Sequence, residues 1–199
     1  MNPYANPGCL LLSLLAAAVV ATANAGADEP KKEGAKPAPT EPVEMLADLR
    51  NPAGVGFARG SWEGRVAKTA SGMLVQGHRG ADGTGEMGGD FAAPHDLSKA
   101  KAVEVALGVG LQNEVSEITV AFDDASETQY TARIRIDQIV PEQPVWLRVR
   151  RADFKLNNWQ GNKAGAAFDW TKIIRWHLQG DWSKGAPFQV VFIALRDRQ

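Results

Sequence analysis

Hydrophobic and polar residues alternate with a period of two along much of the chain after residue 100. The pattern recurs in five runs, Val103–Val109, Ile118–Phe122, Tyr130–Ile136, Val145–Val149 and Ile174–Leu178. A period of two is typical of β-strands that bury one face and expose the other. A sixth run, Phe188–Leu195, is apolar on both faces, and we interpret it as a final strand.

Residues that favour turns separate these runs, and no long amphipathic helix pattern interrupts them. Acidic residues and a serine occur at Asp123–Ser126, two prolines at Pro141–Pro144, and a glycine followed by an aspartate at Gly180–Asp181. Asp, Pro and Gly are the residues that tight turns select. Many short strands joined by such turns indicate an antiparallel sandwich or barrel. We predict an all-β fold, an antiparallel β-sandwich.

Matching the apolar faces of successive strands gives a hypothetical register. We pair Val120 with Tyr130, and Ile136 with Val145, because a slip of one residue would turn every side chain to the other face. Polar side chains of three strands would then share one face. These are Glu117, Thr119, Thr131, Arg133, Arg135, Trp146, Arg148 and Arg150, joined by Arg175 and His177 if their strand belongs to the same sheet.

The first 25 residues have the pattern of a signal peptide. Cys9–Val20 is a continuous apolar run of suitable length, too short to span a bilayer comfortably, and Ala23–Ala25 supplies small residues for cleavage. No Lys or Arg precedes the run, so the alternative is an uncleaved anchor or a misplaced start codon. We predict cleavage after Ala25 and a periplasmic or secreted protein, which would contact a membrane only through an uncleaved signal.

Residues 26–42 differ in composition from the rest of the chain. They contain four prolines, seven charged residues and no large apolar side chain, so they cannot bury enough surface to offset the entropy of ordering. We predict a disordered linker at 26–42 and a folded domain at 43–199. Cleavage would also remove Cys9, the one cysteine, and with it any disulfide or thiol chemistry.

The charge balance and the motifs argue against two classes of function. With 22 basic and 23 acidic residues the net charge is −1, whereas a nucleic-acid-binding domain normally has a basic excess. No Gly-x-Ser-x-Gly motif is present, and the carboxylates of Asp123 and Asp124 lie in a predicted turn that would not raise their pKa. We find no positive sign of catalysis.

Several short motifs occur in an order that is similar to a known group of domains. They are Asp96-Leu97-Ser98, Tyr130–Ile134, Trp146–Val149, Asp169–Ile173 and the run from Phe188. This order resembles the carbohydrate-binding-module jelly rolls of the galactose-binding-domain-like group and the related complex I intermediate-associated protein domain. The resemblance implies a non-catalytic module that binds glycans or assists protein assembly. Some members hold a structural calcium ion, but Phe188–Leu195 lacks the acidic residue common in their last strand, so we carry over no cofactor.

Arginines and one tryptophan form the first candidate site. Arg133, Arg135, Trp146 and Arg148 lie on the predicted polar face. A guanidinium can hold a carboxylate through two hydrogen bonds, and an indole can stack on a sugar ring. These residues would suit an acidic polysaccharide such as one containing uronic acids. The alternative is a solvated face, on which Glu117 neutralises Arg133 and arginine stems cover the indole.

Loop tryptophans form the second candidate site. Trp159 stands among asparagines and a glutamine, and Trp182 follows an aspartate. Aromatic rings beside amide groups commonly contact sugars, although loop aromatics can also fold under the rim of a sandwich. We assign Trp170 and Trp176 to the core instead.

A metal site is the third candidate, with the weakest pattern. The possible ligands His78, Glu86, Asp90, His95 and Asp96 match no known ligand spacing. Asp96 is better explained as a turn residue before Ser98, and His95 as an exposed loop residue. We expect no metal. The sequence thus predicts an exported, non-catalytic binding module for a glycan; the alternative is an envelope protein-interaction or assembly factor.

Overall fold

The computed structural model of the chain describes residues 41–77, 83–158, 162, 165–181 and 186–199. The predicted signal peptide and most of the predicted linker lie outside the described residues, as do Trp159, Trp182 and His78. Within the described ranges, no helix is long and apolar enough to cross a membrane.

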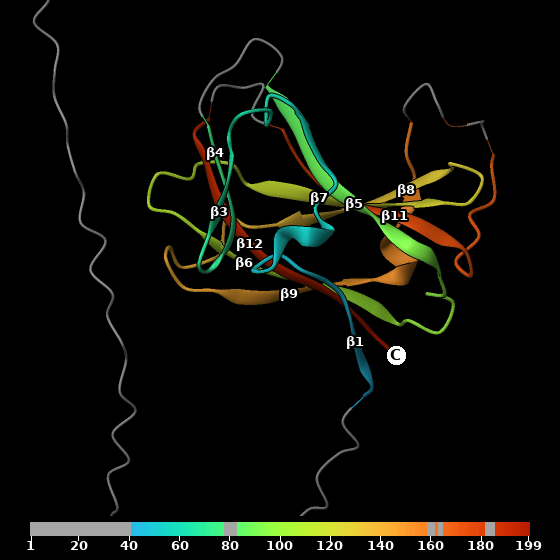
Figure 1. The fold of residues 1–199 in the computed structure, drawn as a ribbon. Helices are drawn as coiled ribbons and strands as arrows, with labels where there is room; N and C mark the ends of the chain where they lie inside the picture. Colours follow the sequence, from blue (N-terminus) through green and yellow to red (C-terminus); the bar gives the residue numbers. More distant parts are fainter. Residues whose placement is uncertain (1–40, 78–82, 159–161, 163–164, 182–185) are drawn as a thin grey trace, which may run out of the picture. The chain divides into compact units, whose positions relative to one another are not determined.

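Twelve strands in the described part of the chain form two antiparallel six-stranded sheets (Figure 1). Sheet A has the order β3 (Val66–Thr69), β4 (Gly72–Gly77), β12 (Phe188–Arg198), β6 (Ala102–Val109) and β9 (Val145–Arg150), and β1 (Val43–Asp48) also pairs with β12. Sheet B has the order β10 (Lys155–Leu156), β8 (Gln129–Arg135), β7 (Glu117–Asp124), β11 (Ile173–Asp181), β5 (Thr84–His95) and β2 (Phe57–Gly60). The 3-10 helices η1 (Pro52–Gly54) and η2 (Arg151–Asp153) lie in the connections. The predicted all-β antiparallel sandwich is confirmed.

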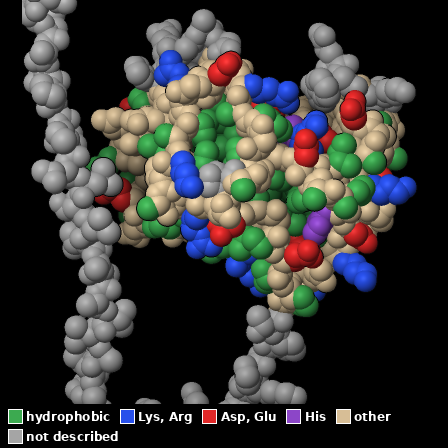
Figure 2. Space-filling view, in the orientation of Figure 1, with side chains coloured by type: hydrophobic (Ala, Val, Ile, Leu, Met, Phe, Trp, Pro, Cys, Tyr) green, Lys and Arg blue, Asp and Glu red, His purple; other side chains and the backbone are tan. Residues whose placement is uncertain are grey.

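Apolar side chains from the inward faces of both sheets form one core. Its largest fully buried members are Trp62, Trp176, Phe122, Phe188, Phe192, Leu49, Met87, Leu97, Leu107, Ile118 and Ile136. Burying one such side chain contributes about 1.5–3 kcal/mol. Trp176 is 2% exposed and Trp170 packs against this core, as predicted. On the face shown in Figure 2, hydrophobic side chains lie among polar ones, and charged side chains of both signs are scattered around them.

Trp62 has the most specific place in this core. It lies between β2 and β3, is fully buried, and packs against Phe188 and Phe192 with ring centroids 5.6 and 5.9 Å away. Gly85 and Gly180 are paired across β5 and β11. A Cβ would lie 2.0 Å from the indole at Gly85 and 2.8 Å from it at Gly180. The two glycines therefore make room for the indole, a packing relation that the sequence pattern did not reveal.

The predicted register between β7 and β8 is shifted by two residues. Val120 pairs with Ala132, not with Tyr130, and Thr119 pairs with Arg133. A shift of two residues leaves every side chain on its predicted face because the strand period is two.

The predicted pairing of Ile136 with Val145 is wrong. The segment after β8 crosses from sheet B to sheet A, where β9 pairs with β6 and Glu104 lies opposite Arg148. Alternation identifies which side chains share a face of a strand but not which strand lies beside it. The predicted polar face is therefore divided, with Arg133 and Arg135 on sheet B and the residues of β9 on sheet A.

Two further expectations need correction. His95 is the last residue of β5, with its ring stacked on Phe91 at 5.2 Å, so it is no exposed loop residue. The last strand continues to Arg198 and therefore contains an acidic residue, Asp197, which is buried and accepts a hydrogen bond from the backbone of Glu44 on β1. Asp96 is a turn residue as predicted, because its carboxylate accepts a hydrogen bond from the backbone N–H of Ser98.

Candidate functional site

A polar groove of about 820 Å³ crosses the outward face of sheet B. One row of paired residues crosses five strands, running Arg59, Glu86, Gln179, Thr119 and Arg133. A second row crosses four strands, running Asp90, Arg175, Asp123 and Gln129. Paired residues share a face of the sheet, so polar side chains from five strands line one continuous surface.

His177 lies between the two rows and joins them. Its side chain is 1% exposed. Nδ1 lies 3.1 Å from Glu86 Oε2, and Nε2 lies 2.9 Å from Asp123 Oδ2. A protonated imidazole can donate from both nitrogens, so it can hydrogen-bond to both carboxylates at once.

The protonation of His177 and Glu86 follows from these contacts. Burial disfavours the charged imidazole, but the hydrogen bonds and charges of Asp123 and Glu86 outweigh it and raise the pKa of His177. Burial also opposes ionisation of Glu86, but hydrogen bonds from His177, Gln179 and Arg59 outweigh it and lower its pKa to about 2. The structure thus favours an imidazolium between two carboxylates.

The second row is fixed by a chain of contacts. Arg175 Nε lies 2.5 Å from Asp90, and its Nη1 lies 3.4 Å from Asp123 Oδ2. Gln129 donates a 3.0 Å hydrogen bond from Nε2 to Asp123 and accepts a 2.5 Å bond at Oε1 from Asn157 Nδ2. These side chains are held in place by one another before any ligand arrives, which lowers the entropic cost of binding.

Phe57 packs against two residues that line the groove, His177 and Arg59. Its ring meets His177 edge-on at 5.4 Å, and the guanidinium of Arg59 lies over it at 4.7 Å. Gly88 stands between Phe57 and His177 in the register, and a Cβ there would lie 2.6 Å from the Phe57 ring. The absence of a side chain at Gly88 therefore lets the ring approach the imidazole.

The groove carries more acidic than basic side chains. Its cations are Arg59, Arg133 and Arg175, and its carboxylates are Glu86, Glu117, Asp123, Glu127 and Asp181. Even with His177 protonated, the lining has a net charge of about −1. An anionic ligand is therefore disfavoured here.

The structure places the predicted binding residues at different sites. Arg133 lines the groove, and the predicted addition of Arg175 and His177 to its face is confirmed. Arg135 shares this face but hydrogen-bonds to Asp137. Trp146 and Arg148 lie on sheet A, so they cannot act together with Arg133 on one sheet face. The prediction that Trp159 and Trp182 contact sugar concerns residues outside the described part of the chain.

Several groove residues were not identified from the sequence as binding residues. The sequence predicts a hairpin turn at Asp123, but this residue lies within β7, one position before its last residue, and is 6% exposed. Glu86 was considered as a metal ligand, but it pairs with His177 and Arg59. Alternating polar residues at Arg175, His177 and Gln179 were a usable signal, whereas the glycine-rich sequence of β5 concealed a strand. Within the described ranges no cluster of His, Cys, Asp and Glu is arranged to hold a metal.

Two antiparallel sheets packed face to face define the β-sandwich class of fold, and solved structures of similar fold are known. The family 11 carbohydrate-binding module of the cellulosomal cellulase Lic26A-Cel5E of Clostridium thermocellum has a TM-score of 0.57 and 12% identity, over 79% of this chain and 95% of that chain. The family 11 module from the same organism in complex with a β-1,3-1,4-mixed-linked tetrasaccharide has a TM-score of 0.56 and 15% identity, over 80% and 96%.

A third similar structure is the xylan-binding module CBM15, with a TM-score of 0.51 and 12% identity over 79% of this chain and 96% of that chain. No protein-family model matches the sequence, and no curated protein matches it. At these identities the likeness establishes the fold. The chain has the galactose-binding-like jelly-roll fold of carbohydrate-binding modules, as the sequence motifs implied.

Proposed function

We propose that this chain is an exported, non-catalytic carbohydrate-binding module that holds a neutral glycan in the groove of sheet B. The observation that carries the proposal is the pair of polar rows, in which carboxylate, amide and guanidinium groups alternate and are already positioned by mutual hydrogen bonds. Such groups can hydrogen-bond to adjacent sugar hydroxyls as donors and acceptors. The fold shared with carbohydrate-binding modules supports the same function.

The charge of the groove favours a neutral glycan over an acidic one. Carboxylates outnumber guanidinium groups in the lining, so a uronic acid chain would meet repulsion there. The same carboxylates argue for binding over catalysis. A glycosidase needs one carboxylic acid with a raised pKa, whereas the pKa of Glu86 is lowered to about 2.

The experiment compares two arginines of β8 in the full chain. Arg133 and Arg135 are both exposed, share one sheet face and each pair with one carboxylate, Glu117 and Asp137, but of the two only Arg133 lines the groove. A glycan array first selects a neutral oligosaccharide, and calorimetry then measures its Kd. Losing a charge-assisted hydrogen bond should make Arg133→Ala bind about tenfold more weakly, and Arg135→Ala should stay within about twofold.

Equal effects of the two substitutions would contradict the proposed site. Complete silence of the array toward neutral glycans would contradict glycan binding in the groove and would favour the protein-interaction alternative. Unfolding curves of both variants serve as the control, because exposed arginines of this kind contribute less than about 1 kcal/mol to stability.

A further inference from the structure

The outward face of sheet A has a different character from that of sheet B. The small residues Ala102 and Ala106 lie along its middle strand, β6, and are almost fully buried. Arginines lie on the two neighbouring strands, Arg196 and Arg198 on β12 and Arg148 and Arg150 on β9. Guanidinium groups from both sides therefore cover β6.

Glu104, in the middle of β6, holds three of these arginines together. Its side chain is 5% exposed and accepts hydrogen bonds from the Nε atoms of Arg148, Arg196 and Arg198 at 3.0, 2.7 and 2.9 Å. Burial disfavours its charge, but these three arginines outweigh that effect and lower the pKa of Glu104 to about 2. One fixed negative charge thus holds three positive charges. Since a guanidinium has five N–H donors, pairing through Nε leaves donors for a ligand.

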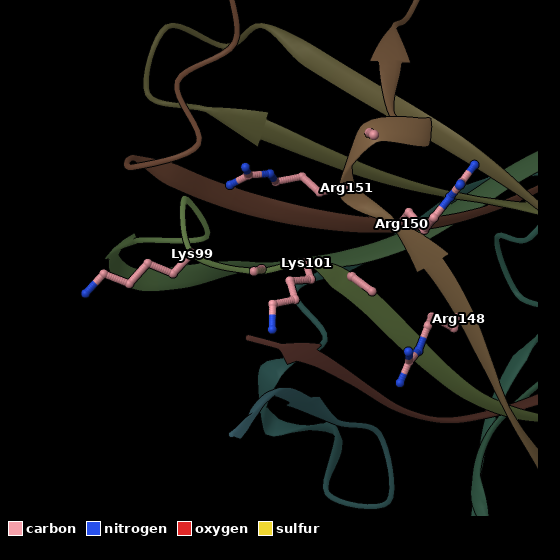
Figure 3. A pocket seen from close by; sticks show the side chains of 8 residues that line it. Lys99, Lys101, Arg148, Arg150 and Arg151 are labelled. Atoms are coloured by element: carbon pink, nitrogen blue, oxygen red, sulfur yellow. The ribbon is translucent and has the colours of Figure 1, made fainter. Parts of the chain in front are cut away.

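A cleft of about 420 Å³ lies on this face where β6 begins and β9 ends. Five cations line it together with Ala100, Ala102 and Ala152: Lys99, Lys101, Arg148, Arg150 and Arg151. In Figure 3 the side chains of Lys101 and Arg148 extend in the same direction, whereas Arg150 points away from them. Arg150 pairs with Asp153 at 2.8 Å.

Counting charges over the cleft and the outward face of sheet A together gives a clear excess. The seven cations are Lys99, Lys101, Arg148, Arg150, Arg151, Arg196 and Arg198. The carboxylates that interact with them are Glu104, Glu41, Asp153 and Asp96. Three positive charges remain in excess, although the whole chain has a net charge of −1. This concentration attracts anions.

Trp146 adds an aromatic surface to this face. It is 42% exposed, and the guanidinium of Arg196 lies 3.6 Å from its ring centroid. Such a cation–π contact orients the ring. Trp146 lies two residues before Arg148 on the same face of β9, so the exposed part of the ring is next to that arginine. Apolar ring surface beside guanidinium groups is the combination that binds a charged sugar.

We infer that the outward face of sheet A and its cleft form a second carbohydrate site, which binds an acidic polysaccharide carrying carboxylates or sulfates. Charge complementarity supports this occupant. The exposed indole of Trp146 beside the guanidinium groups also supports it, because a sugar ring can stack on an indole. The inference is independent of the neutral-glycan site, since it concerns the other sheet and the opposite charge.

The test removes cations that do not hold Glu104, so that no buried carboxylate loses a partner. The full chain with Lys99→Gln, Lys101→Gln and Arg150→Gln is compared with a matched control carrying Arg65→Gln, Lys68→Gln and Lys172→Gln, which alters three exposed cations elsewhere. Calorimetry measures the Kd for an oligogalacturonate and for dextran sulfate at low salt. We expect the first variant to bind at least about tenfold more weakly and the control to change less than about twofold.

The inference is overturned if neither anionic probe binds, or if the two variants lose affinity equally. It is also overturned if vesicles containing anionic phospholipid bind the wild-type chain as tightly as the polysaccharides do and bind the variant without the three cations more weakly. That result would assign the face to a membrane. Binding of a neutral oligosaccharide is measured in parallel. It should be unchanged by the three substitutions, so that failure of either site is seen separately.

Discussion

At the scale of single residues, His177 has the most consequential environment in the molecule. It is almost completely buried and lies within 3.1 Å of one carboxylate and 2.9 Å of another. Without the imidazolium, Glu86 and Asp123 would face each other with only their remaining partners to balance them. His177 therefore both stabilises the fold and fixes the positions of the two carboxylates in the groove.

Replacing His177 with alanine should lower the free energy of unfolding by about 3 kcal/mol. Removing one partner of a buried ion pair leaves uncompensated charge, which has a cost of this order, although Arg59, Gln179 and Gln129 still contact the two carboxylates. Urea unfolding at pH 6 measures the change. Arg133→Ala, which removes an exposed ion pair, is the control and should change stability by less than about 1 kcal/mol. If His177→Ala also lowers the free energy of unfolding by less than about 1 kcal/mol, the imidazole is not charged.

At the scale of strands, the alternation of polar and apolar residues predicted which side chains share a face of a strand. It was less informative about which strands lie side by side. The alternation in β8 placed Arg133 and Arg135 outward and Ile134 inward, as observed. It could not show that β9 pairs with β6, because both strands of a possible pair have the same period. Strand partners are decided by long-range packing, which a local pattern does not contain.

The alternation also does not reveal every strand, because some strands contain few β-branched or large apolar residues. β5 is twelve residues long but rich in glycine and alanine, and Thr84 is its one β-branched residue, so its sequence does not indicate a strand. Its glycines are needed for packing, since Gly85 and Gly88 leave space for the rings of Trp62 and Phe57. The fold could thus be predicted from β6 to β9 and from β11 and β12, but Thr84, Gly85 and Glu86 of the groove lie on a strand without a recognisable pattern.

At the scale of the whole molecule, the titrating groups predict where the fold is most stable. The pKa of Glu86 and that of Glu104 are both lowered from 4.5 to about 2, so their contribution is present above about pH 4.5 and is lost as the pH falls toward 2. Each contributes up to about 3 kcal/mol. The pKa of His177 is raised above 6.5, so its contribution is present below 6.5 and is lost as the pH rises through the raised value.

Stability should therefore be greatest between about pH 4.5 and 6.5. Chemical unfolding at a series of pH values checks this expectation. The decline on the alkaline side should disappear in His177→Ala, whereas the decline on the acidic side should remain because of Glu104. A stability that is constant from pH 2 to 5, or that increases above pH 7, would contradict these assignments.

The two outer faces of the sandwich also divide the molecule by charge. The groove of sheet B has an excess of carboxylates, and the outward face of sheet A has an excess of cations. A module of this kind could hold two different polymers at once, one on each face. The central claim of this arrangement is that a neutral glycan binds to sheet B.

Chemical-shift mapping of the isotope-labelled full chain tests this claim most directly. A neutral oligosaccharide selected on the array is titrated while backbone amide signals are recorded. We predict that the signals that change belong to β5, β7, β8 and β11, around Glu86, Thr119, Arg133 and Gln179. Changes confined to β6, β9 and β12 would contradict the account.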